Sequence, residues 1–85
     1  MTCARETVEA VLTETFNVLP QEMKPEAVLS SLDMDSLAVV ELLFVLEREL
    51  GVKIGEDEVT PRNTVRELVA TVEAKLARRS AGPGR

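Results

Sequence analysis

The group in this sequence best suited to chemistry is a serine with an acid before it and a leucine after it. Asp35, Ser36 and Leu37 stand where a polar stretch gives way to a long apolar pattern. The position predicts an exposed hydroxyl at the start of a helix, close to the positive end of the helix dipole. A phosphate ester on that oxygen would be electrostatically favoured. Asp and Ser also cap helices, so a purely structural role is the alternative.

Composition removes the usual means of activating such a serine from within. The 85 residues include no histidine, so there is no Ser–His pair and the commonest metal ligand is missing. Cys3 is the only cysteine, which excludes an internal disulfide and a cysteine-based zinc site. We therefore expect no enzyme and no metal site. Any chemistry on a group attached to Ser36 would be done by a protein that docks beside it.

The charge of the chain narrows the class of partner. The formal net charge is −5, and the last eight residues contain three of the ten basic ones. An acidic body repels nucleic acid and anionic membranes and favours basic protein surfaces, although acidity can also serve solubility alone. The longest apolar run, residues 42–46, is too short to span a bilayer, and the N-terminus does not read as a signal peptide. We expect a cytoplasmic monomer without nucleic-acid or membrane partners.

The periodicity predicts the helices that must position the serine. Apolar residues at helical spacing predict a helix over residues 4–16, which Thr2 could cap, and a second over 36–50, which Gly51 ends. Residues 17–35 form a long loop between them, and its apolar anchors predict that it packs against the helices. These anchors are Val18, Leu19, Val28, Leu29 and Leu32.

The second half of the chain predicts less regular structure before a final helix. Val52 and Ile54 are expected to turn inward from a short loop, and residues 56–59 to form one helical turn. A capping box from Thr64 to Glu67 starts the last helix. We place the domain at residues 1–79 and a flexible, dispensable tail at 80–85.

The second helix has more apolar residues than one core face requires. Its core stripe consists of Val39, Leu42, Leu43, Leu46 and Leu50. A second stripe of Leu37, Val40 and Phe44 lies roughly opposite, with Glu41, Glu47 and Arg48 at its margins. Either the helix is central and buried on several sides, or the second stripe is a docking patch rimmed by charge. Because buried unpaired charges are costly, the margins favour the exposed patch.

The run from Leu32 to Leu37, Leu-Asp-Met-Asp-Ser-Leu, resembles the attachment motif Leu-Gly-x-Asp-Ser-Leu of the acyl carrier proteins. The resemblance covers about residues 4–78. It implies an all-α fold, a small four-helix bundle with a long first loop and a short third helix. It also implies that Ser36 receives a 4′-phosphopantetheine arm from coenzyme A through a phosphopantetheinyl transferase. The thiol of the arm would hold acyl groups as thioesters for an acyltransferase, ketosynthase or acyl-ligase type of enzyme.

The same resemblance implies which residues partners contact. Asp35 and Leu37 match the surface that the transferase recognises. Four residues match positions that other partners of such carriers contact: Val40, Glu41, Phe44 and Glu47. Arg48 lies beside them, where many fatty-acid carriers have an acidic residue.

Departures from the family pattern predict the subtype. Asp33 stands where the family usually has Gly, Phe44 is bulkier than the usual Met or Leu, and Arg48 reverses a charge. These departures favour a discrete carrier that serves polyketide biosynthesis, including antibiotic biosynthesis. A housekeeping fatty-acid carrier is an alternative. A peptidyl or aryl carrier of nonribosomal peptide synthesis is a further alternative, although the chain lacks the Gly-Gly-(His/Asp)-Ser sequence usual at the attachment site of those carriers. A helical adaptor with an unmodified Ser36 is the alternative outside the carriers.

Overall fold

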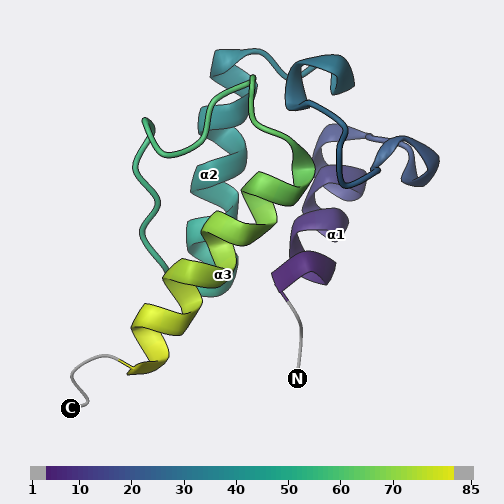
Figure 1. Ribbon diagram of the computed structural model, residues 1–85. Helices are drawn as coiled ribbons and strands as arrows, with labels where there is room; N and C mark the ends of the chain where they lie inside the picture. Colours follow the sequence, from purple (N-terminus) through teal and green to yellow (C-terminus); the bar gives the residue numbers. More distant parts are fainter. Residues whose placement is uncertain (1–3, 82–85) are drawn as a thin grey trace.

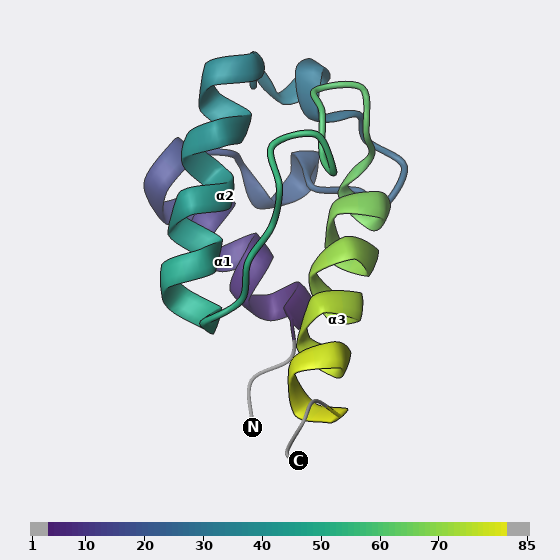
Figure 2. The ribbon, with the colours of Figure 1, turned by 90° about the vertical axis from the view of Figure 1, so that its left-hand side faces the viewer.

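Three α-helices joined by irregular connections make up the structure, a computed structural model that describes residues 4–81 (Figure 1). They are α1 (Ala4–Phe16), α2 (Ser36–Leu50) and α3 (Val65–Ala81), with short 3-10 helices at Pro20–Glu22 and Leu29–Leu32. α1 runs opposite to α2 and α3, which both descend from the same end of the molecule (Figures 1 and 2). The connection after α2 must therefore return along the whole bundle before α3 begins. The expected helices at 4–16 and 36–50 are confirmed.

The short third helix that the resemblance implied is not found within residues 4–81, so the expected count of four helices is wrong. The chain makes a single hydrogen-bonded turn at residues 55–58, close to the one helical turn predicted for residues 56–59. The Glu58 N–H donates to the Gly55 carbonyl at 3.0 Å, and the Gly55 N–H donates to the Glu58 carboxylate at 2.9 Å. The other carboxylate oxygen of Glu58 lies 2.7 Å from Lys75 Nζ, which ties the turn to α3. Pro61 follows and has no N–H with which to continue a helix. Residues 4–81 thus form an all-α fold with three α-helices.

The capping box predicted at the start of α3 is confirmed. The Glu67 N–H donates to Thr64 Oγ1 at 3.1 Å, and the Thr64 N–H donates to Glu67 Oε1 at 2.9 Å. Asn63 Nδ2 donates to the same carboxylate oxygen at 2.9 Å. The side-chain hydrogen bond from Asn63, followed by the one from the Thr64 backbone, holds the pKa of Glu67 below its ordinary value.

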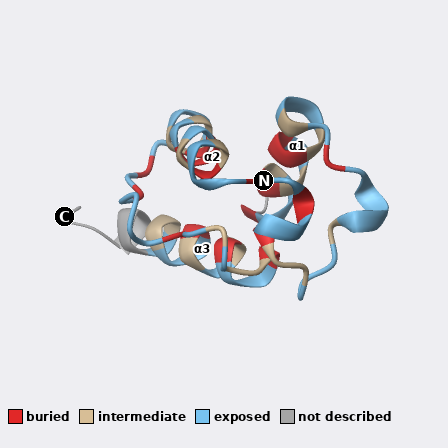
Figure 3. Cartoon of the chain, turned by 90° about the horizontal axis from the view of Figure 1, so that it is seen from above, coloured by how far each residue is buried: buried red, intermediate tan, exposed pale blue. Residues whose placement is uncertain are grey.

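The apolar core lies between the three helices, and Figure 3 shows buried positions on their facing sides. Val52 and Ile54 turn inward from the second connection, as predicted. In the first loop Leu29 and Val18 are buried anchors, but Leu19 is half exposed, so that anchor is wrong. The helical core residues are Ala4, Val8, Val11 and Leu12 from α1, Val39, Leu42, Leu43 and Leu46 from α2, and Val65, Leu68 and Val72 from α3.

Backbone hydrogen bonds fasten the first loop to the residues around the start of α3. Donors on the loop are the N–H groups of Leu29 and Ser30, which bond to the carbonyls of Asn63 and Pro61 at 2.9 Å each. Donors at the start of α3 are those of Val65 and Arg66, which bond to the carbonyls of Ala27 and Pro25, also at 2.9 Å. Val28 and Thr64 face each other as an isolated antiparallel bridge. The long loop is therefore a packed part of the fold.

The predicted domain bounds, residues 1–79 with a tail at 80–85, stay predictions. α3 continues through Ala81, two residues into the segment expected as a tail. Residues 82–85, together with Thr2 and Cys3 at the other end, lie outside the described residues.

Candidate functional site

Ser36 is the first residue of α2, and Asp35 takes the capping role that the sequence left open for an Asp or Ser at this position. Asp35 has an extended backbone, with φ −85° and ψ −175°, and its Oδ1 accepts the N–H of Ala38 at 2.8 Å. Both Asp35 and Ser36 are exposed. The serine hydroxyl thus stands in solvent at the positive end of a 15-residue helix.

The turn before the serine alternates buried and exposed residues. Leu32 and Met34 are buried at 9% and 2% exposure, whereas Asp33 and Asp35 face solvent. Asp33 adopts the left-handed conformation, with φ 63° and ψ 29°. Glycine accepts this conformation without steric cost, which explains why a family that needs the turn would favour Gly here. Asp33 therefore keeps the turn at the cost of some backbone strain.

Two depressions meet at Ser36. One has a volume of about 440 Å³ and is lined by Ser30, Asp33, Met34, Asp35, Ser36 and Pro61. The other, of about 260 Å³, separates α2 from the returning connection and is lined by Ser36, Val39, Val40, Glu56, Val59, Thr60 and Pro61. Residues 59–61 were not predicted as neighbours of the serine. The one sequence signal for this packing is the apolar Val59 that follows three acidic residues, and the structure buries it.

The second stripe of α2 is open to solvent, as its charged margins predicted. The side chains of Leu37 and Phe44 are 68% and 60% exposed. Glu41 and Arg48 are exposed beside them, while Val40 is half-buried against the depression next to Ser36. In a helix, Leu37, Glu41 and Phe44 share one face, so the chain presents an uncovered apolar strip that begins beside the serine.

Glu47 differs from the other predicted docking residues. It is half-buried, and its Oε2 accepts the N–H of Ile54 at 2.8 Å. The Ile54 side chain is buried at 4% exposure. The carboxylate therefore holds the connection after α2 against the helix, a role that the sequence pattern did not indicate.

Within residues 4–81 no group of three or more acidic, histidine or cysteine side chains is arranged to hold a metal ion. Over the same range no helix has both the length and the apolar character needed to cross a membrane.

Residues 6–72 match the model of the phosphopantetheine attachment site family. The chain belongs to the acyl carrier protein family. It is 40% identical over 70 residues to an acyl carrier protein of Helicobacter hepaticus, covering 81% of this chain and 92% of that protein. It is 36% identical over 73 residues to an acyl carrier protein of Thermosynechococcus vestitus, covering 85% and 90% respectively.

A relative with a more specific name also matches. The meromycolate extension acyl carrier protein of Mycobacterium tuberculosis is 31% identical over 67 residues, which are 78% of this chain and 58% of that protein. No solved structure matches the chain at the significance of these relatives.

Family membership establishes the cofactor, a covalently attached 4′-phosphopantetheine. Acyl carrier proteins interact with phosphopantetheinyl transferases and with enzymes that process acyl groups. The structure fits such a group, because the exposed hydroxyl of Ser36 opens onto two depressions at a helix N-terminus that favours a phosphate.

Proposed function

We propose that Ser36 carries the 4′-phosphopantetheine arm and that the chain presents acyl thioesters to partner enzymes. The observation that carries this proposal is the exposed serine at the first position of α2, next to the uncovered strip of Leu37 and Phe44. The arm's phosphate would lie at the helix N-terminus, where the dipole stabilises negative charge. The arm supplies the thiol that forms the thioester.

The chain itself has no histidine that could take the proton from Ser36. Attachment therefore needs a transferase, which removes the hydroxyl proton as Oγ attacks the phosphate of coenzyme A that bears the pantetheine. The pyrophosphate bond breaks, and adenosine 3′,5′-bisphosphate leaves. The family carries acyl groups and does not catalyse their reactions. We propose the same division of labour here.

Attachment is tested by intact-mass measurement after incubation with coenzyme A, magnesium and a broad-specificity transferase. We expect one added phosphopantetheine on the native sequence and none on Ser36→Ala. An unchanged mass for a folded native protein would leave the adaptor interpretation in place. Modification that survives Ser36→Ala would show that another residue carries the arm.

We infer that partners dock on the uncovered strip of α2 and its exposed charges. Phe44→Ala and Glu41→Lys should weaken acyl transfer and leave the helical circular dichroism nearly unchanged, because both side chains face solvent. Leu19→Ala is the matched control, since Leu19 is 50% exposed but lies in the first loop. If the Phe44 variant melts early, the strip belongs to the core.

For the pathway we propose a discrete carrier of polyketide or related specialised metabolism. Support comes from Asp33, Phe44 and Arg48, which depart from the common pattern at the turn and on the exposed face of α2. A fatty-acid carrier is the alternative that the generic names of the relatives favour. The test is the mass of the thioester on the protein isolated from its producer: a simple saturated series would refute the polyketide assignment.

A further inference from the structure

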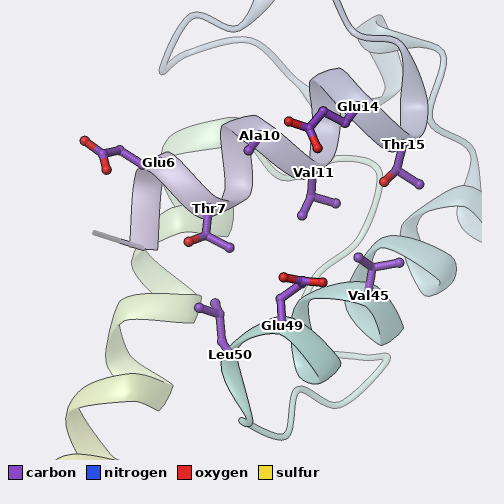
Figure 4. Close-up of a pocket in the computed structure, with 9 residues that line it drawn as sticks. All are labelled: Glu6, Thr7, Ala10, Val11, Glu14, Thr15, Val45, Glu49 and Leu50. Atoms are coloured by element: carbon purple, nitrogen blue, oxygen red, sulfur yellow. The ribbon is translucent and has the colours of Figure 1, made fainter. Parts of the chain in front are cut away.

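A groove lies between α1 and α2, beside the exposed strip of α2. It has a volume of about 510 Å³. Figure 4 shows Thr7, Val11 and Thr15 of α1 pointing toward α2, and Val45 and Glu49 of α2 pointing toward α1. The remaining lining residues are Glu6, Ala10, Glu14 and Leu50.

The groove combines an apolar floor with an acidic rim. Val11 is buried and Val45 and Leu50 are half-buried, whereas Glu6, Glu14 and Glu49 are exposed. None of the lining residues is basic. Within residues 4–81 the ion pairs are Arg5–Glu9 and Glu58–Lys75, and neither involves these three carboxylates. Three acidic groups around an apolar groove attract positive charge on any body that fills it.

The groove is continuous with the face of α2 proposed for docking. At 100° per residue, Glu41, Val45 and Glu49 follow one another around α2 from the exposed strip toward α1. A partner seated on Phe44 and Glu41 can therefore reach the groove without crossing a core element. From Glu6 to Thr15 the groove follows α1 for about 14 Å, at 1.5 Å per residue, which matches two and a half turns of a helix.

We propose that this groove binds a basic amphipathic helix of a partner protein. The apolar side chains of that helix pack on Val11 and Val45, and its lysines or arginines face Glu6, Glu14 and Glu49. The contact lies on the α1 side of the helix that begins with Ser36 and does not involve that serine. Recognition here is thus independent of the arm, and the inference stands apart from the proposed attachment site.

The probe is an amphipathic leucine–lysine peptide of about 16 residues, because shorter helices are marginal in water. Binding is mapped by amide shifts in NMR spectra of the isotope-labelled protein, with a leucine–glutamate peptide as control. We expect the largest shifts at residues 7–15 and 45–50, no binding of the acidic peptide, and weaker binding at high salt.

Reversing the charge of rim glutamates tests whether the acidic rim is responsible for binding the basic peptide. Glu14→Lys with Glu49→Lys should weaken binding at least about fivefold, since two exposed ion pairs become repulsive. Glu26→Lys, an exposed reversal in the first loop, should change affinity less than twofold, and Ser36→Ala should bind as the native protein does. Shifts confined to the Leu37–Phe44 strip, unchanged affinity of the double variant, or no saturable binding would each overturn the proposal. Failure of attachment at Ser36 would leave these outcomes unaffected.

Discussion

Replacing Glu47 separates a structural carboxylate from a docking one. The resemblance to acyl carrier proteins places Glu47 among partner contacts, but in the structure its Oε2 accepts the Ile54 N–H at 2.8 Å. Glu47→Ala leaves that donor without its partner in a half-buried position, and orphaned buried donors cost about 1–3 kcal/mol. Because the site is partly open to water, we expect a loss of about 1–2 kcal/mol in the free energy of unfolding.

The assay is thermal unfolding followed by circular dichroism, with urea titration for the free energy. For a chain of this size each kcal/mol shifts the midpoint by about 4–8 °C, so Glu47→Ala should melt roughly 5–15 °C lower. Glu47→Gln keeps an acceptor oxygen and should recover most of the loss. Glu41→Ala, an exposed carboxylate on the same helix, should stay within about 0.5 kcal/mol of the native protein. A Glu47→Ala variant as stable as Glu41→Ala would refute the reasoning and return Glu47 to the docking face.

Three further predictions concern the helix ends. Asp35→Ala removes the acceptor of the Ala38 N–H and should cost about 1 kcal/mol of stability in urea unfolding, with Asp35→Asn close to native; equal losses in both would contradict a capping role. Gly51→Ala forces a side chain into the left-handed backbone at φ 68° and should lower the free energy of unfolding by about 1–2 kcal/mol. Thermal melting measures this loss, and an unchanged midpoint would contradict the strain at this position. Because hydrogen bonds, first that from Asn63, lower the pKa of Glu67 in the folded state, its contribution is present above the ordinary pKa of 4.5 and is lost as pH falls below it. Urea unfolding at a series of pH values should therefore show a smaller acid loss for Glu67→Gln, and identical slopes would argue against the assignment.

The sequence predicted the elements whose signals are local. The spacing of apolar residues placed α1 and α2 at their observed bounds, and the capping box placed the start of α3. The exposure of Ser36 and Phe44 also followed from local pattern and charge. The cap at Asp35 is the structural alternative that the sequence left open for Asp or Ser.

What could not be predicted depends on backbone contacts between distant segments. The hydrogen bonds from Leu29 and Ser30 to Asn63 and Pro61 involve main-chain groups, which every residue carries, so no side-chain pattern reports them. The short third helix was implied by the resemblance, whereas the reciprocal bonds between Gly55 and Glu58 close the chain after a single turn.

The same long-range bonds bear on when the serine's surroundings form during synthesis. The loop before Ser36 finds its main-chain partners on residues 61–66, which are translated about thirty to forty positions later. A nascent chain that has just exposed Ser36 therefore has the serine but lacks the wall of its two depressions, which Pro61 contributes. A transferase that reads the shape of this region would find its substrate only after residues 61–66 have been synthesised and have folded back onto the loop.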